Sequence, residues 1–206
     1  MKTIEVTGKT VDEALKAGME ELGVGEMTDI EYEVLEEANP GFLGLLGGRP
    51  ARIKMWLLAP EVKARRLLEE IMDRMGIRGE TQISKVGEYY EIQVEGDDLG
   101  ILIGRRGRTL DALQYLANLA ANRGSSDRVR IIVDAASYRQ RRAETLRNLA
   151  QRLCQRARRQ RRKVVLEPMT PQERRIIHLT VQGEKGMTSY SQGEDPHRRV
   201  VIALEG

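Results

Sequence analysis

The 206-residue sequence predicts an α+β protein of three small domains, with a long arginine-rich helix joining the second domain to the third. Short segments in which apolar and polar residues alternate, as is typical of strands, are interspersed with segments of helical periodicity. Aromatic residues make up only 4% of the chain, which favours several small cores over one large core. Charge is also divided unevenly along the chain, as expected when neighbouring domains differ in their partners.

The positive charge is concentrated in the C-terminal third. Residues 1–60 hold 6 Lys and Arg against 11 Asp and Glu, a net charge of −5. Residues 61–134 hold 12 against 13, and residues 135–206 hold 16 against 7, giving −1 and +9. Such a bias is typical of a domain that binds nucleic acid or another acidic surface. The alternative is a helix whose basic face is merely solvated.

Other features of the composition predict a soluble cytoplasmic protein. The single cysteine, Cys154, excludes a disulfide within the chain and favours a reducing compartment. The first residues, Met1–Glu5, lack the apolar core of a signal peptide. No apolar run is long enough to span a bilayer.

The first predicted domain, residues 1–58, is an acidic β-α-β-β unit. Thr10 and Glu13 have the spacing of a capping box at the start of its helix, and Gly23 ends the helix. The predicted elements are a strand at 2–7, a helix at 10–22, and strands at 30–36 and 51–58.

A glycine-rich loop with apolar residues, Asn39–Gly48, separates the last two strands of this domain. Two interpretations stay open. The apolar residues either fold back onto their own sheet or form an exposed tip that docks on a partner.

The second predicted domain, residues 61–134, follows Pro60. Its predicted order is helix, strand, strand, helix, GxxG loop, helix, strand. The ranges are a helix at 61–76, strands at 80–86 and 89–95, a short helix before Gly104, a helix at 107–122 and a strand at 128–133.

The third predicted domain, residues 137–206, is introduced by a long helix at about 135–163. Thr170, Pro171 and Glu173 have the pattern of an N-cap, a first-turn proline and a capping box for a second helix. Strands are expected at 164–166, 187–191 and 198–204. The predicted apolar stripe of the long helix is Leu146, Leu149, Ala150, Leu153, Cys154 and Ala157.

The GxxG pattern occurs five times in the chain, so the pattern alone is weak evidence. Only the copy at Gly104–Gly107 joins two predicted helices and encloses two cations, Arg105 and Arg106. Glycine lets another backbone approach closely, and the N-terminus of the following helix offers unpaired N–H groups. Two guanidinium groups can pair with phosphates. The alternative is a plain corner between two helices. A P-loop is excluded because no GK[ST] sequence follows.

With this loop and this order of elements, residues 61–134 resemble a type II KH domain, whose GxxG loop clamps single-stranded nucleic acid. The resemblance also implies an apolar groove beside the loop, for which Ile101, Leu102 and Ile103 are candidates, although we expect most of them to belong to the core. It assigns nucleic-acid contacts to Ile103, Gly104, Arg105, Arg106, Gly107 and Arg108.

A second motif lies on the helix that follows Thr170. Arg174 and His178 are four residues apart and therefore share one helix face. A lone histidine is often structural, but the chain continues through Ser189–Pro196 to two more arginines. This pattern resembles the R-3-H domain, named for its Arg-x-x-x-His helix, which binds single-stranded nucleic acid. The resemblance assigns nucleic-acid contacts to Arg174, Arg175, His178, Arg198 and Arg199.

The order of the three domains is similar to that of the bacterial Jag protein family, and Gly41-Phe42-Leu43-Gly44 matches a signature of its N-terminal domain. The resemblance implies a single-stranded RNA-binding protein, either an RNA chaperone or a post-transcriptional regulator, linked to cell-wall synthesis and cell elongation. It also implies a small partner KH protein and association with a second copy of the chain. Many Jag proteins have a long linker after the first domain, whereas Pro60 is almost the only spacer here.

Nothing in the sequence predicts catalysis, and no cofactor or metal is expected. The two histidines and one cysteine have no recognisable ligand or nucleophile spacing. Asp97 and Asp98 could form an acid–base pair, but a helix N-cap is the favoured interpretation. Three alternatives to the main hypothesis stay open: a ribosome-associated RNA-binding factor, a protein-interaction scaffold acting through the N-terminal domain, and binding of single-stranded DNA instead of RNA.

Overall fold

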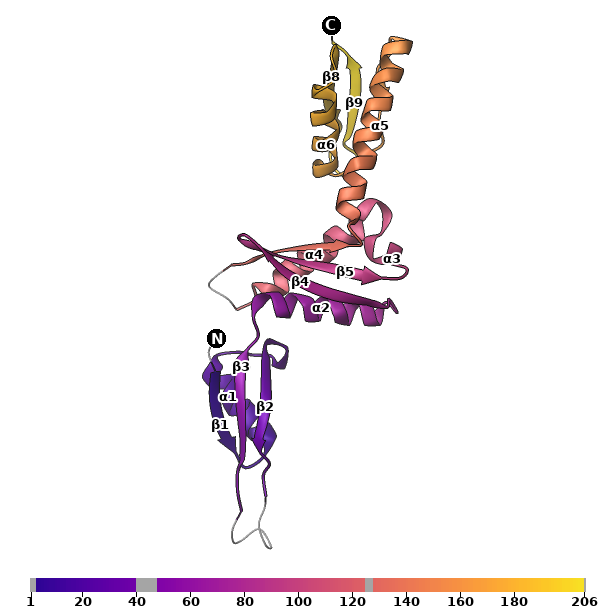
Figure 1. Ribbon diagram of the computed structural model, residues 1–206. Coiled ribbons are helices and arrows are strands. Elements are labelled where there is room, and N and C mark those ends of the chain that lie inside the picture. Colours follow the sequence, from indigo (N-terminus) through magenta and orange to yellow (C-terminus); the bar gives the residue numbers. More distant parts are fainter. Residues whose placement is uncertain (1–2, 40–47, 125–127, 206) are drawn as a thin grey trace. The chain divides into compact units, whose positions relative to one another are not determined.

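The computed structural model describes residues 3–39, 48–124 and 128–205 (Figure 1). These residues form α-helices and three separate three-stranded sheets, which confirms the predicted α+β class. By its contacts the chain divides into two units, Met1–Ala136 and Ser137–Gly206. The first unit contains two of the sheets, and the second contains the third.

The N-terminal sheet has the order β1-β3-β2 and is antiparallel throughout. Helix α1 packs on the face that carries the fully buried Ile53 and Met55. It approaches closely because Gly18 has no side chain, and a Cβ there would lie 2.2 Å from the sulfur of Met55. The elements are β1 (Thr3–Gly8), α1 (Val11–Leu22), β2 (Ile30–Glu36) and β3 (Ala51–Leu57).

The predicted capping box of α1 forms only in part. The Thr10 hydroxyl accepts a hydrogen bond from the backbone N–H of Glu13, at 3.2 Å. The Glu13 carboxylate, however, accepts from the N–H of Lys9 rather than from the N-cap residue. Of the glycine-rich loop predicted at Asn39–Gly48, residues 40–47 lie outside the described residues.

The second sheet has the order β4-β5-β6, with β4 antiparallel and β6 parallel to β5. Helices α2 and α4 pack against each other beside it. The observed order confirms the predicted helix-strand-strand-helix-helix-strand arrangement. The elements are α2 (Pro60–Arg74), β4 (Gly79–Val86), β5 (Tyr89–Gly96), α3 (Gly100–Ile103), the short 3-10 turn η2 (Arg105–Gly107), α4 (Arg108–Ala121) and β6 (Arg130–Ala135).

Two details of this domain differ from the prediction. Strand β6 ends at Ala135 rather than at residue 133, because Asp134 and Ala135 continue the parallel pairing with β5. The N-cap interpretation of Asp97 and Asp98 is wrong. Leu99 is the N-cap residue of α3, and no side chain caps that helix.

The C-terminal unit consists of a third sheet, of order β7-β9-β8, and two helices. Its buried cluster takes residues from both helices and from β9, and every residue of the stripe predicted on the long helix belongs to this cluster or packs against it. The predicted capping box at Thr170 and Glu173 forms completely. The elements are α5 (Tyr138–Gln160), β7 (Val164–Val165), α6 (Pro171–Gln182), β8 (Met187–Gln192) and β9 (Arg199–Leu204).

None of the described helices has the length and apolar character needed to cross a membrane. Across the same described residues, no group of His, Cys, Asp and Glu side chains is arranged to hold a metal ion.

Candidate nucleic-acid interface

The GxxG loop has a backbone that favours glycine at both ends. Gly104 has a φ of 70° and Gly107 a φ of 77°, values that side chains other than glycine rarely adopt. Gly104 is also crowded, because a Cβ there would lie 2.0 Å from the Thr109 hydroxyl oxygen. Arg106 has a φ of 59° without being a glycine. Strained backbone of this kind is concentrated at functional sites.

The loop presents cations directly before a helix N-terminus. Arg105, Arg106 and Arg108 are exposed, whereas Gly107 is buried at the N-cap of α4. The first N–H of the 14-residue α4, at Arg108, donates to the Arg105 carbonyl, whereas the next N–H groups of the first turn have no partner within the helix. The helix dipole adds partial positive charge at this end. Backbone donors and guanidinium groups therefore meet at one place, an arrangement suited to a phosphate.

The apolar residues before the loop divide between core and surface. Leu102 is fully buried, so its assignment to a groove is wrong. Ile101 is 62% exposed and Ile103 is half-buried. Two of the three candidates therefore remain accessible beside the loop.

In the C-terminal unit, the arginine of the Arg-x-x-x-His motif is a buried residue. The Arg174 guanidinium donates two hydrogen bonds to the Asp195 carboxylate, at 2.7 and 3.2 Å, and one to the carbonyl of Met169, at 2.8 Å. Hydrogen bonds from Arg174 hold the pKa of Asp195 below its ordinary value. Arg174 thus links α6 to the turn before β9.

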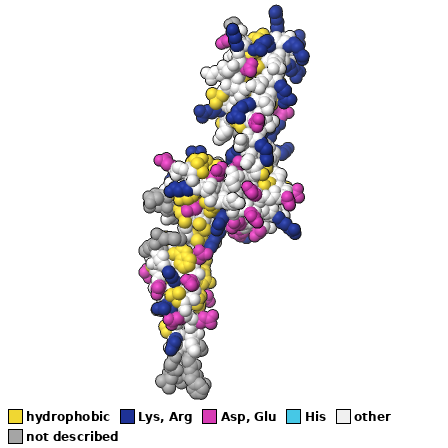
Figure 2. All heavy atoms as spheres, viewed as in Figure 1, with side chains coloured by type: hydrophobic (Ala, Val, Ile, Leu, Met, Phe, Trp, Pro, Cys, Tyr) yellow, Lys and Arg dark blue, Asp and Glu magenta, His cyan; other side chains and the backbone are white. Residues whose placement is uncertain are grey.

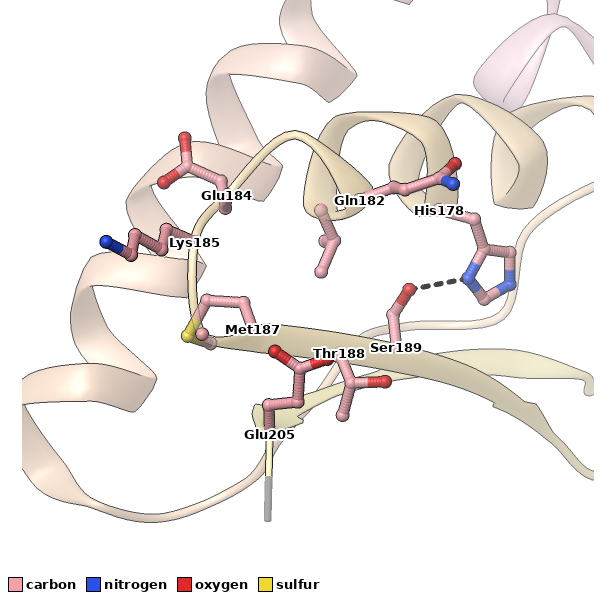
Figure 3. Close-up of a pocket in the computed structure, with 10 residues that line it drawn as sticks. His178, Gln182, Glu184, Lys185, Met187, Thr188, Ser189 and Glu205 are labelled. Carbon is pink, nitrogen blue, oxygen red and sulfur yellow. Dashed lines mark hydrogen bonds between the residues drawn. The ribbon is translucent and has the colours of Figure 1, made fainter.

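His178 is held between two serine hydroxyls of β8. Its Nδ1 shares a 2.7 Å hydrogen bond with Ser189 Oγ, the contact drawn in Figure 3, and its Nε2 shares one of 2.9 Å with Ser191 Oγ. Partial burial, followed by the positive charges of Arg174 and Arg198, lowers the pKa of His178 below its ordinary value of 6.5. The ring is therefore neutral near physiological pH.

Hollows lie on both sides of His178. One, of about 570 Å³, extends past Ser189 towards Glu184 and Glu205 (Figure 3). The other, of about 360 Å³, is bordered by Arg175 and Arg198 as well as by His178. Arg175 and Arg198 are exposed and, within residues 3–39, 48–124 and 128–205, make no ion pair or side-chain hydrogen bond. Their charges are available to an anion.

The visible surface of the C-terminal unit is largely basic. In Figure 2 most of the charged side chains visible on the C-terminal unit are Lys or Arg. The exposed arginines of α5 include Arg141, Arg147, Arg152 and Arg159. Such a surface attracts polyanions over distances comparable with the Debye length.

Three family models match successive parts of the chain. They are described as Jag N-terminus over residues 6–57, KhpA/KhpB KH domain over residues 62–133, and R-3-H domain over residues 144–204. A protein of Clostridium symbiosum named RNA-binding protein KhpB is 40% identical over all of this chain and 93% of its own length. A Bacillus subtilis protein of the same name is 35% identical, over 98% of this chain and 99% of its own length.

The chain belongs to the Jag (KhpB) family. A more distant relative from Streptococcus pneumoniae has the same name and is 31% identical, over 95% of this chain and 57% of its own length. KH and R-3-H domains are binding modules.

In this Jag-family chain, the partners of Arg174 and His178 could not be predicted from the spacing of the motif. Asp195, which holds Arg174, lies 21 residues away in sequence. Ser189 and Ser191 could have been found, because alternate residues of a strand point to the same face and can both reach one ring. The ion pair between Arg142 of α5 and the buried Glu173, at 2.8 Å, has no comparable sequence signal.

Proposed function

We propose that this chain binds single-stranded RNA through two modules, the GxxG loop of the KH domain and the hollow beside His178 in the R-3-H domain. The loop carries the proposal most directly. Its two glycines of positive φ fix a tight turn directly before α4, and Arg105 in that turn is an exposed cation. Arg105 makes no ion pair or side-chain hydrogen bond within the described parts of the chain.

The second module supplies phosphate contacts of a different geometry. Arg175 comes from α6 and Arg198 from the turn before β9, so two elements place cations at the rim of one hollow. Arg199 begins β9 directly after Arg198 and is also exposed. The basic face of α5 adds attraction that does not depend on sequence. Under this proposal Arg174 and His178 shape the hollow, while Arg175 and Arg198 contact phosphate.

RNA is the proposed ligand because the full-length relatives are named RNA-binding proteins and share all three domains with this chain. Single-stranded DNA is the competing ligand. Direct competition between RNA and DNA oligonucleotides of one sequence separates the two, since only RNA offers the 2′-hydroxyl.

We further propose a cytoplasmic RNA chaperone or post-transcriptional regulator that acts on cell-wall synthesis and cell elongation. The support is the domain order of the family, in which two nucleic-acid-binding modules follow one another. The sequence also gives no expectation of a catalytic group. Deletion of the gene should change cell length or shape, and a chain that cannot bind RNA should fail to restore it.

A protein partner is proposed for the KH domain, either a small KH protein or a second copy of this chain. On α4, Tyr115 is 67% exposed, Leu119 is 59% exposed and Leu116 is 41% exposed. With Leu67 of α2 they border a hollow of about 700 Å³. A continuous exposed apolar patch of this kind is typical of a protein interface.

Crosslinking and sequencing of bound RNA tests the main proposal. The variant Arg105→Asp/Arg106→Asp should recover far less RNA than the wild-type chain. The variant Arg74→Asp/Lys85→Asp changes net charge equally at exposed positions of the same domain outside the loop, and should recover RNA normally. Equal recovery from all three proteins would contradict a role for the loop.

A further inference from the structure

The sheet of the R-3-H domain has one face that lies outside the core cluster formed with α5 and α6. In the strand register, Val165 of β7 and Tyr190 of β8 both lie opposite Val201 of β9, so the three form a row across the sheet. Their neighbours Val200 and Ile202 belong to the core cluster with α5 and α6, and Val164 packs against it. Because adjacent strand residues point to opposite faces, the row lies on the outer face.

Two of the three row residues are exposed. Val165 is 47% exposed and Tyr190 is 45% exposed, whereas Val201 between them is fully buried. The flanking side chains therefore shield Val201 and leave a flat apolar surface with an aromatic ring at one side. Tyrosine at such a position offers a face on which an unpaired base can stack, and stacking of this kind is tolerant of base identity.

The charge at the Arg199 end of this face is suited to nucleic acid, whereas Glu205 follows Ala203 at the opposite end, beside Thr188. Arg199 lies on β9 two residues before Val201, and is therefore diagonal to Tyr190 across the strand pair. Diagonal neighbours are about 7–8 Å apart, within reach of long side chains. Arg199 is exposed and, among the residues that the structure describes, makes no ion pair. The other paired positions on this face are Thr188, Gln192 and Ala203, none of them acidic.

The face also continues from the proposed phosphate site. Arg198 borders the hollow beside His178, and Arg199, the next residue, belongs to the outer face. An RNA strand held at Arg198 therefore meets a second cation and then an aromatic ring as it passes the start of β9. This continuity, together with the absence of acidic side chains at the paired positions, favours RNA over a protein as the occupant.

We propose that the outer face of this sheet is a second RNA subsite, in which an unpaired base stacks on Tyr190 and the adjoining phosphate pairs with Arg199. The subsite rests on the proposed RNA-binding function and extends it. It adds aromatic stacking, which neither the KH loop nor the hollow beside His178 supplies.

The test measures binding of a fluorescently labelled single-stranded oligouridine by the full chain, using anisotropy over a range of salt concentrations. Tyr190→Leu keeps apolar cover over Val201 but removes the flat ring, and should raise the Kd roughly five- to hundredfold without changing the salt dependence. Tyr190→Phe should bind like the wild-type chain. Arg199→Gln should reduce the slope of log K against log salt by about 0.7.

A matched control and a direct readout complete the test. Tyr32, 40% exposed on β2 of the N-terminal sheet, is replaced by Leu and should leave binding unchanged. In Tyr190→Trp, added RNA should quench the new indole, against the background of the chain's single tryptophan, Trp56.

The outcomes distinguish a failure of the proposed RNA-binding function from a failure of the stacking subsite alone. Failure of the wild-type chain to bind RNA would overturn the proposed function and the subsite together. If the wild-type chain binds and Tyr190→Leu binds equally well, only the stacking subsite is overturned. A Kd that changes equally in Tyr190→Leu and Tyr32→Leu would also overturn it.

Discussion

Arg174 and Asp195 are joined by two hydrogen bonds, of 2.7 and 3.2 Å, between helix α6 and the turn before β9. A third hydrogen bond, to the carbonyl of Met169, leaves the Arg174 side chain 9% exposed. The next residue, Arg175, is exposed at the rim of the hollow beside His178. Two consecutive arginines of one motif therefore have different roles, one in the fold and one at the surface.

Arg174→Ala and Arg175→Ala should separate these roles. The first removes three hydrogen bonds of a buried cation, and should lower the free energy of unfolding in urea by roughly 1–3 kcal/mol. The second changes an exposed side chain and should stay within about 0.5 kcal/mol of the wild type, while weakening RNA binding. Equal stability of the two variants would contradict the structural role of Arg174.

The pKa of His178 predicts a pH dependence with a defined sign. Because this pKa lies below 6.5 in the folded chain, the unfolded chain binds more protons just below pH 6.5. The contribution of His178 to stability is therefore fully present above pH 6.5 and decreases as the pH falls through the lowered pKa. His178→Gln should remove this part of the pH dependence in urea unfolding.

RNA should shift the same pKa upward. A phosphate bound at the rim formed by Arg175 and Arg198 favours the protonated ring of His178. NMR titration of the His178 ring protons, with and without oligouridine, measures the change. A free-chain pKa at or above 6.5, or no rise on binding, would count against the predicted site.

Gly104→Ala should be far more damaging than Gly100→Ala. Gly104 has a φ of 70° and its added Cβ would meet Thr109, whereas a Cβ at Gly100 meets nothing within 4 Å. With a ψ of −177°, Gly104 lies in a region of backbone space that is essentially restricted to glycine, and the strain alone is about 1–3 kcal/mol. Thermal unfolding should show a clear decrease for Gly104→Ala and little change for Gly100→Ala. The RNA affinity of Gly104→Ala should fall as well, and a variant that kept both properties would contradict the loop geometry.

Leu119→Glu tests the proposed partner surface on α4. Leu119 is 59% exposed, so the substitution should alter the free energy of unfolding by no more than about 0.5 kcal/mol. Sedimentation with a small partner KH protein, and of the chain alone, should show weaker association, while RNA binding by the isolated chain is retained. Unchanged association in both experiments would exclude this surface as the interface.

Much of the fold could be predicted because its local signals agree with its packing. The stripe from Leu146 to Ala157 repeats with helical period and is the buried face of α5. Thr170 and Glu173 form the predicted capping box. In contrast, Asp97 and Asp98 have the composition of a helix cap, yet α3 begins after Leu99, and Asp98 has a φ of 54°. Composition alone did not determine the backbone conformation of that turn.

The candidate site was harder to predict, because its properties depend on contacts between distant residues. The spacing of Arg174 and His178 predicted one shared face, and both border the same hollow. The spacing could not indicate that the Arg174 guanidinium is hydrogen-bonded to the Asp195 carboxylate. It also could not separate Arg198, which borders this hollow, from Arg199, which the strand register places on the outer face of the sheet.

The most direct test of the central claim is the salt dependence of RNA binding by the wild-type chain and by Arg105→Asp/Arg106→Asp, with Arg74→Asp/Lys85→Asp as the charge-matched control. We expect a steep loss of affinity with salt for the wild type and the control, and a lower affinity with a shallower salt dependence for the loop variant. Identical affinities and slopes for all three proteins would contradict the claim that the loop grips RNA.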